Sequence, residues 1–337
     1  LKIFGFEPGQ KLIPSAGMNE FLSAIVLNKS LEEILSDRDL VKITACIEAT
    51  IPFIQVNEAG LTHPEVLASR LQQLNEQYGF GMSAEEVVEV MQLAVLFANK
   101  DVDSFADVDT GRFLDSTWKL LPETHAVLRS HEMYSITDYR KAMESMERFM
   151  NFLKPEIIYK EYNGVPSKDT LGNMILQAQN NIVAAREYLG IKLLTIAIME
   201  ALAAQTGGDA PIALFMGDIE RRRSDSNAQR LENFLPPTPP FNADDKSQIV
   251  YHLLGSGREN ESDFDLKNSP LSLYIYKVFS RQQLQEYLDA AKLMFKGKLS
   301  PDQFIKALDK ETLTHVIRAS ASVAITRKER LLALIQS

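Results

Sequence analysis

Carboxylate side chains are concentrated between residues 99 and 115, where they could supply oxygen ligands to a divalent cation. Five aspartates fall within fifteen residues: Asp101, Asp103, Asp107, Asp109 and Asp115. Their spacing differs from that of a calcium-binding loop, because Phe105 stands where such a loop needs an oxygen ligand. Spacing alone therefore favours a loop after a helix, in which the aspartates cap helices and stabilise turns.

Histidine, a common ligand of transition metals, is rare in this chain. The five histidines are His63, His125, His131, His252 and His315. None is followed by aspartate, and none precedes residue 63. We expect His63 to lie exposed in a turn before a helix, and His252 and His315 to lie on helices. A metal shared by His125 and His131 would need a loop between them, because residues six apart point in different directions on one helix.

Three short motifs follow one another in an informative order. They are Asn19-Glu20 with Ser23-Ala24, then Ile47-Glu48-Ala49-Thr50, then Asn99-Lys100-Asp101-Val102. This order resembles that of the HD-domain hydrolases, which are all-α enzymes that bind a divalent metal through a histidine, a His-Asp pair and a distant aspartate. The resemblance covers about residues 15–105.

The resemblance implies both a site and a reaction. Asp101 takes the place of the last metal-binding aspartate, and Glu20 takes the place of a catalytic acidic residue near the metal. The implied cofactor is a divalent metal, and the implied substrate is a phosphorylated small molecule or nucleotide. Such an ion acidifies a bound water towards neutral pH, so that the water can attack phosphorus in a phosphate ester or phosphodiester.

Two interpretations account for the missing histidine ligands. Either the ligands precede Leu1 in a longer protein, or the chain is a degenerate relative that has lost its metal. The first interpretation gives a metal-dependent phosphohydrolase of HD type. The second gives a non-catalytic helical module that binds a regulatory ligand or a partner. Because only Asp101 matches the metal-binding pattern, we expect the chain by itself to bind no transition metal tightly.

Several other reactive or charged groups are interpreted as structural. Cys46 lies in an apolar stretch without a neighbour that would lower the pKa of its thiol. Gly207-Gly208 follows an apolar helix without the lysine of a phosphate-binding loop, which indicates a helix end and a turn. Glu200 lies on that apolar helix and needs a partner, for which Arg186 and Lys192 are the candidates.

Composition and charge exclude several classes of protein. The 337 residues carry a net charge of −9, and the most basic run, Arg221–Arg223, is short, so we expect no nucleic-acid partner. A single cysteine excludes an internal disulfide and favours a reducing compartment, which makes the cytoplasm the expected location. No apolar run reaches the roughly 18 residues of a membrane span, and no signal peptide is recognised. The oligomeric state stays open.

Apolar residues recur at helical spacing along most of the chain, while the alternation typical of strands is scarce. We therefore predict an all-α fold. Residues 189–204 are apolar on nearly all sides, which predicts the most buried helix. Helices are predicted after the caps Ser83 and Ser300, and over residues 136–153, 171–205, 280–295 and 313–335.

Prolines interrupt the helical pattern between residues 235 and 240. Such proline density forbids a helix and favours an extended backbone. We therefore predict an HD-like helical bundle over residues 1–235. A Pro-rich linker and a C-terminal helical subdomain are predicted over residues 236–337.

Overall fold

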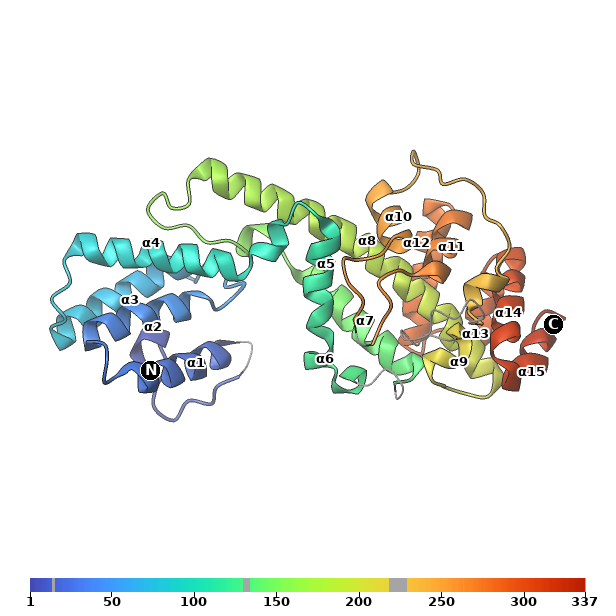
Figure 1. Ribbon diagram of the computed structural model, residues 1–337, viewed down its shortest axis with the longest axis horizontal. Helices are drawn as coiled ribbons and strands as arrows, with labels where there is room; N and C mark the ends of the chain where they lie inside the picture. The colour runs from blue at the N-terminus through green and yellow to red at the C-terminus, as the bar shows by residue number, and fades with distance from the viewer. Residues whose placement is uncertain (14–15, 130–133, 218–228, 263, 337) are drawn as a thin grey trace. The chain divides into compact units, whose positions relative to one another are not determined.

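The computed structural model describes residues 1–13, 16–129, 134–217, 229–262 and 264–336. Regular structure in these ranges is helical, and backbone pairing of the sheet type is limited to isolated bridges such as that of Ser135 with Pro211. The predicted all-α class is confirmed, and the helices are labelled in Figure 1. No helix within the described ranges is both long enough and apolar enough to cross a membrane.

The chain forms two compact units, each assembled from two stretches of sequence. Unit 1 comprises Leu1–Val108 and Leu153–Ile182, and unit 2 comprises Asp109–Phe152 and Val183–Ser337. The boundary predicted near residue 236 therefore lies inside unit 2. A run of prolines predicts an extended backbone. It does not distinguish a linker between two domains from a loop within one domain.

Within its described residues, unit 1 consists of four α-helices and the first part of α8, which runs over Lys168–Thr206. The four are α1 (Met18–Leu31), α2 (Asp37–Ala49), α3 (His63–Tyr78) and α4 (Ala84–Asp101). Short 3-10 turns cover Lys2–Phe4, Asp103–Ala106 and Pro155–Ile157. The core forms where α2, α3 and α4 pack together, and its most buried members include Leu67, Leu71, Met91 and Ala94.

Polar side chains set where the helices of unit 1 begin. Thr62 starts α3 with a complete capping box. At the start of α4, Ser83 accepts a hydrogen bond from the Glu86 backbone N–H at 3.2 Å, as predicted. The Glu86 carboxylate does not complete a capping box with Ser83, because it pairs with Arg38 and Lys42 of α2 instead. The start of α4 is therefore predicted correctly from the sequence, whereas the contact of Glu86 with α2 is not.

Unit 2 contains the remaining helices and the second part of α8. Before α8 come α5 (Thr110–Lys119), α6 (Leu121–Thr124) and α7 (Ile136–Phe152), with a 3-10 turn over Ala126–Arg129. After it come α9 (Ile212–Met216), the 3-10 turn Leu231–Phe234, α10 (Gln248–Gly255), α11 (Pro270–Val278), α12 (Arg281–Phe295), α13 (Pro301–Ala307), α14 (Lys310–Val323) and α15 (Lys328–Ala333). The capping boxes at Ser280 and Ser300 start α12 and α13.

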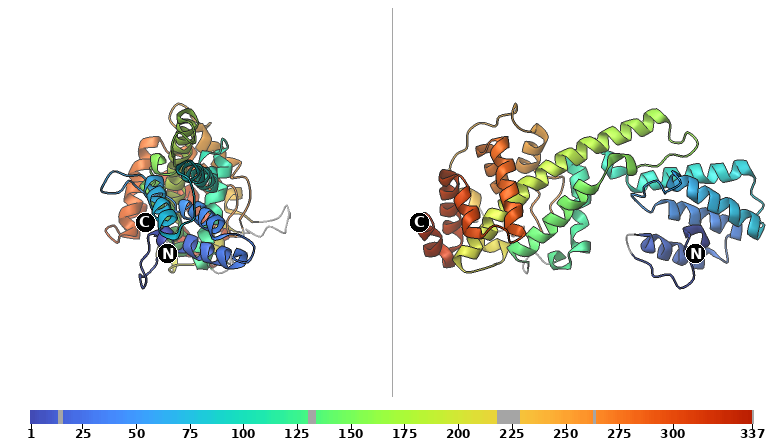
Figure 2. Two further views of the ribbon diagram at one scale, coloured as in Figure 1. Left: turned by 90° about the vertical axis from the view of Figure 1, so that its left-hand side faces the viewer. Right: turned by 180° about the vertical axis from the view of Figure 1, so that it is seen from behind.

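The second part of α8 is the central element of unit 2. Every residue from 188 to 199 is buried. This burial confirms the prediction made from its apolar circumference, because a helix that is apolar on all sides needs neighbours on all sides. Figure 2 shows the surrounding helices of unit 2 from two further directions.

The single helix predicted over residues 313–335 is wrong, because the chain breaks between α14 and α15. A 3-10 turn at Ile325–Arg327 separates them. This turn brings Arg327 to the end of α8, where its guanidinium donates to the carbonyls of Ala203 at 3.1 Å and Gly208 at 2.6 Å. The carbonyls at a helix end lack partners within the helix, so a nearby arginine stabilises it. Apolar periodicity carries no sign of this contact.

Candidate functional site

A buried lysine in unit 1, Lys160, lies within electrostatic reach of three carboxylates. Lys160 is only 8% exposed, and its ammonium donates hydrogen bonds to the carbonyls of Ala49 and, at 2.7 Å, Ile51. Burial lowers the pKa of Lys160 to about 8, although the negative charges of three carboxylates oppose that shift. In order of effect these carboxylates are Glu48, Glu20 and Asp101.

Helix α4 holds the lysine in place. Asn99 donates a side-chain hydrogen bond to the Lys160 carbonyl and accepts one from the Lys160 backbone N–H, both at 2.8 Å. Asn99 is buried and stands two residues before Asp101 on the same helix. The end of α4 therefore positions both the buried ammonium and one of the carboxylates that act on it.

Glu48 anchors the centre of this arrangement. Its carboxylate is 1% exposed, and the Nε2 atom of His63 lies 3.0 Å from each of its oxygens. Arg70 donates to the same carboxylate at 3.0 Å. The prediction that His63 is exposed is therefore wrong, because its side chain is only 6% exposed and pairs with a side chain on α2. A partner fifteen residues away leaves no local sequence signal.

The two residues named by the HD resemblance differ in exposure. Glu20, on α1, is half-buried, and its Oε2 atom is buried without a hydrogen-bond partner. Asp101, the last residue of α4, is exposed. Both act on the Lys160 ammonium, so residues from distant parts of the chain influence one charge.

The carboxylates of Glu20 and Asp101 limit the kinds of metal ion that could bind here. Among the described residues, no group of three or more His, Cys, Asp and Glu side chains has an arrangement that could hold a metal. His63, the histidine of unit 1, already bonds Glu48 through Nε2. Two carboxylates without imidazole fit a hard ion such as Mg²⁺, which keeps several waters and binds through one or two carboxylates. They do not fit a zinc centre, which needs about three protein ligands.

Three of the other aspartates of this region serve local structure. Asp109 caps a helix as predicted, whereas Asp103 and Asp115 form ion pairs, and Asp115 lies within α5 rather than in the predicted loop. Asp103 pairs with Lys100 at 2.5 Å. In unit 2, Asp109 caps α5 by accepting the Gly111 N–H at 2.8 Å, while Asp115 pairs with Lys119 at 3.0 Å. Capping and ion pairing therefore account for these three carboxylates.

The partner predicted for Glu200 is wrong. Its carboxylate pairs with Arg140 of α7 at 3.0 Å and also accepts from the Thr137 hydroxyl at 3.3 Å. Lys192 pairs instead with Asp265, and Arg186 donates to the Met150 carbonyl. Both predicted partners lie on the same helix as Glu200. Because a buried helix is surrounded by other helices, the actual partner comes from a neighbour.

Three further predictions concern the glycine pair after α8, the single cysteine, and residues that lie outside the described ranges. Gly207 and Gly208 follow the end of α8 with positive φ, as expected for a helix end and turn. Cys46 is half-buried, and burial raises the pKa of its thiol. His131 and the run 221–223 lie outside the described residues, so a site shared by His125 and His131 is not tested.

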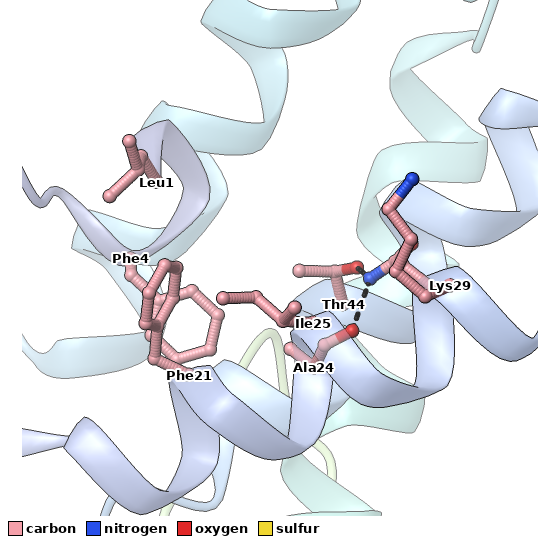
Figure 3. Close-up of a pocket in the computed structure, with 8 residues that line it drawn as sticks. Leu1, Phe4, Phe21, Ala24, Ile25, Lys29 and Thr44 are labelled. Atoms are coloured by element: carbon pink, nitrogen blue, oxygen red, sulfur yellow. Dashed lines mark hydrogen bonds between the residues drawn. The ribbon is translucent and has the colours of Figure 1, made fainter.

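A small pocket on α1 and α2 offers no obvious chemistry. Its volume is about 200 Å³, and it is lined by Leu1, Phe4, Phe21, Ala24, Ile25, Asn28, Lys29 and Thr44. The Asn28 amide donates to the Ala24 carbonyl at 2.7 Å and to the Thr44 hydroxyl at 2.9 Å. Figure 3 draws these two bonds as dashed lines that end at the labelled Ala24 and Thr44. The rings of Phe4 and Phe21 pack edge to face at one end. The lining is thus mainly apolar, and its amide already has partners.

Comparison with known proteins gives no relative on which to base a function. No family model matches the chain, and neither a curated protein nor a solved structure is significantly similar to it.

Proposed function

We propose that unit 1 is a phosphohydrolase-related domain of HD type, in which Glu20 and Asp101 bind a divalent cation. The substrate would be a phosphate ester or phosphodiester in a phosphorylated small molecule or nucleotide. One observation carries the proposal: these two carboxylates, matched independently by the motif order, both act on the buried ammonium of Lys160.

The chemistry of the donors supports a hard ion as the cofactor. A bound ion of this kind would acidify a water and polarise a phosphoryl oxygen. Asp101 is exposed and open to such an ion, while Glu20 has a buried oxygen without a partner. Lys160 adds a positive charge beside the two carboxylates and would attract the phosphate of a substrate. Glu48, fixed by His63 and Arg70, keeps the end of α2 in position.

Titration with Mn²⁺, used as a probe of a weak Mg²⁺-type site and followed by electron paramagnetic resonance, tests the cation site. Asp101→Asn should weaken Mn²⁺ binding at least about tenfold, since even the groups that support a ligand contribute that much. Asp103→Asn is the matched control, because Asp103 is a nearby exposed carboxylate that pairs with Lys100. Hydrolysis of bis(4-nitrophenyl) phosphate should fall with the same variant. Equal effects of the two substitutions, or no Mn²⁺ binding by the unaltered chain, would rule the proposal out.

A second candidate is a non-catalytic helical module, and a specific observation favours it. The Lys160 ammonium bonds to two backbone carbonyls and is the positive charge on which the three carboxylates act, so the protein supplies its own cation. Lys160→Met separates the candidates. In an enzyme it should lower phosphodiester hydrolysis and leave Mn²⁺ bound. In the module the unaltered chain should bind no Mn²⁺, and the variant should gain Mn²⁺ binding once the internal positive charge is gone.

A further inference from the structure

A second buried polar cluster lies within unit 2 and is unrelated to the HD-like motifs. Its centre is one oxygen, Oδ2 of Asp265, in the segment between α10 and α11. Three donors converge on this atom: Trp118 Nε1 at 3.1 Å, the Tyr139 hydroxyl at 2.9 Å and the Lys192 ammonium at 2.9 Å. The Arg258 guanidinium lies 3.6 Å away. We call these five residues the Asp265 cluster.

The charges of the Asp265 cluster do not balance. Lys192 is 5% exposed and Arg258 is 2% exposed, and among the described residues Asp265 is the carboxylate within ion-pairing distance of both. The Nε atom of Arg258 is buried and has no hydrogen-bond partner. An uncompensated buried charge is costly. Two cations around one carboxylate therefore leave the cluster able to accept more negative charge.

Contacts other than Asp265 hold both cations in place. Arg258 donates to the Tyr188 hydroxyl at 3.2 Å and to the Leu266 carbonyl at 3.1 Å, and it lies over the Trp118 ring at 4.3 Å. Lys192 donates to the Ser269 hydroxyl at 3.1 Å and also faces the Trp118 ring. These contacts would keep the cations in position if the carboxylate left, as a preorganised binding site requires.

The Asp265 side chain has a route out of the cluster. It is 16% exposed, and its other oxygen, Oδ1, accepts no hydrogen bond from the described residues and is not among the buried atoms without partners. Its backbone N–H is held by Ser262 at 3.0 Å, so rotation of the side chain alone would remove the carboxylate. The cluster thus reaches the surface through Asp265.

We propose that Trp118, Tyr139, Lys192 and Arg258 form an oxyanion-binding site, and that the Asp265 carboxylate is an internal occupant which a ligand replaces. The ligand is a small molecule that presents a carboxylate or a phosphate. Three donors aimed at one oxygen, two fixed cations and an aromatic wall suit such a group. The electrostatics agree: burial raises the pKa of Asp265, but the positive charges of Lys192 and Arg258 outweigh burial and leave that pKa below its usual value.

The alternative is an ion pair with a purely structural role. Such a pair is stable when each charge has a partner and the remaining donors are satisfied. Here one carboxylate serves two cations, and a guanidinium N–H is left without a partner. The imbalance is the observation that favours binding over structure.

The intrinsic fluorescence of the protein gives a direct test. Trp118 is the only tryptophan in the chain, and its ring N–H donates to the oxygen that the ligand would replace. Asp265→Asn keeps the shape of the side chain and removes its charge. Titration of this variant with inorganic phosphate and with acetate, at constant ionic strength set by sodium chloride, should give a saturable change in Trp118 emission. The unaltered protein should bind at least about tenfold more weakly, because its own carboxylate competes.

Two matched variants locate the binding. Adding Lys192→Met to Asp265→Asn should abolish the saturable change. Glu286→Gln removes the charge of an exposed residue on α12, outside the cluster, and should leave the response of the unaltered protein as it is. Comparison of the affinities for inorganic phosphate and acetate then shows whether the natural ligand presents a phosphate or a carboxylate.

Three outcomes would overturn the proposal. The first is a folded Asp265→Asn variant whose emission shows no saturable response to either anion. The second is a response that persists after Lys192→Met, since binding would then occur elsewhere. The third is loss of near-ultraviolet circular dichroism in Asp265→Asn, because Asp265 would then be a structural counter-ion that the fold cannot release.

Discussion

At the scale of single residues, two of the buried lysines, Lys160 and Lys246, stabilise helix ends. Lys160 bonds the carbonyls of Ala49 and Ile51 at the end of α2. Lys246 does the same at the end of α11, where it donates to the carbonyls of Tyr276 at 2.7 Å and Phe279 at 2.6 Å. Burial lowers the pKa of both lysines. The carbonyls at a helix end attract positive charge, which offsets part of the cost of burying it.

The lowered pKa of Lys160 makes stability depend on pH. The folded protein releases this proton near pH 8, whereas the unfolded chain releases it near 10.5. Between these values the unfolded state binds more protons, so the free energy of unfolding should rise with pH by up to ~3 kcal/mol. Urea unfolding at pH 7.5, 9 and 10 measures this contribution as the difference between the unaltered protein and Lys160→Met. An unchanged difference across these pH values would contradict the burial of the charged lysine.

The buried contacts of Glu48 should contribute to the stability of the folded protein. Glu48→Gln removes the charge that faces His63 and Arg70, and the change should lower the free energy of unfolding by about 1–3 kcal/mol, as expected when a buried hydrogen-bonded charge is lost. Glu33→Gln is the control, because Glu33 is exposed and should change stability by less than about 0.5 kcal/mol. Urea denaturation measures both. Equal stability of the two variants would show that the Glu48 contacts contribute nothing.

The site residues show what a sequence can and cannot reveal at this scale. The capping pattern located Ser83 at the start of α4, and the structure confirms it. Motif order led to Glu20 and Asp101, whose role stays a prediction. Lys160 was missed because a lysine between polar and aromatic neighbours has no pattern that marks burial. The pairing of Glu48 with His63 was missed for the same reason: the partners lie on different helices, and which helices pack together is a property of the whole fold.

At the scale of elements, α8 is the clearest case in which the sequence determines the structure. Ile196 is 4% exposed at the centre of the buried stretch, whereas Val183 on the same helix is 55% exposed. Ile196→Asp should prevent cooperative folding of unit 2, because a buried charge without a partner costs several kcal/mol. Val183→Asp should change the melting temperature little. Circular dichroism and thermal melting compare the two, and a soluble, unshifted Ile196→Asp variant would refute the central role of α8.

Helix ends were harder to predict than helix interiors. The helices after Ser83, Ser280 and Ser300 begin as predicted, because a capping side chain acts on backbone three residues away. The break between α14 and α15 was not predicted. It is set by Arg327, whose donors bond carbonyls at the end of α8, far away in sequence.

At the scale of the whole molecule, each unit contains two separate stretches of sequence. A change in composition marks a boundary only where it occurs, as at the prolines of residues 235–240. The chain passes between the units where composition does not change, and α8 itself runs through Ile182 and Val183 without interruption. The helical class was predictable because it depends on periodicity, whereas the division into units depends on long-range contacts.

Because each unit has its own core, we expect the two units to unfold in separate transitions. Leu71 in unit 1 and Leu194 in unit 2 are both fully buried, so either leucine-to-alanine substitution should cost about 2–5 kcal/mol. Trp118 lies in unit 2 and reports on that unit alone. Leu194→Ala should therefore shift the denaturant midpoint of Trp118 fluorescence. Leu71→Ala should shift only part of the far-ultraviolet circular dichroism transition, which reports helix in both units. If Leu71→Ala moves the fluorescence midpoint as far as Leu194→Ala does, the units unfold together and the separation is wrong.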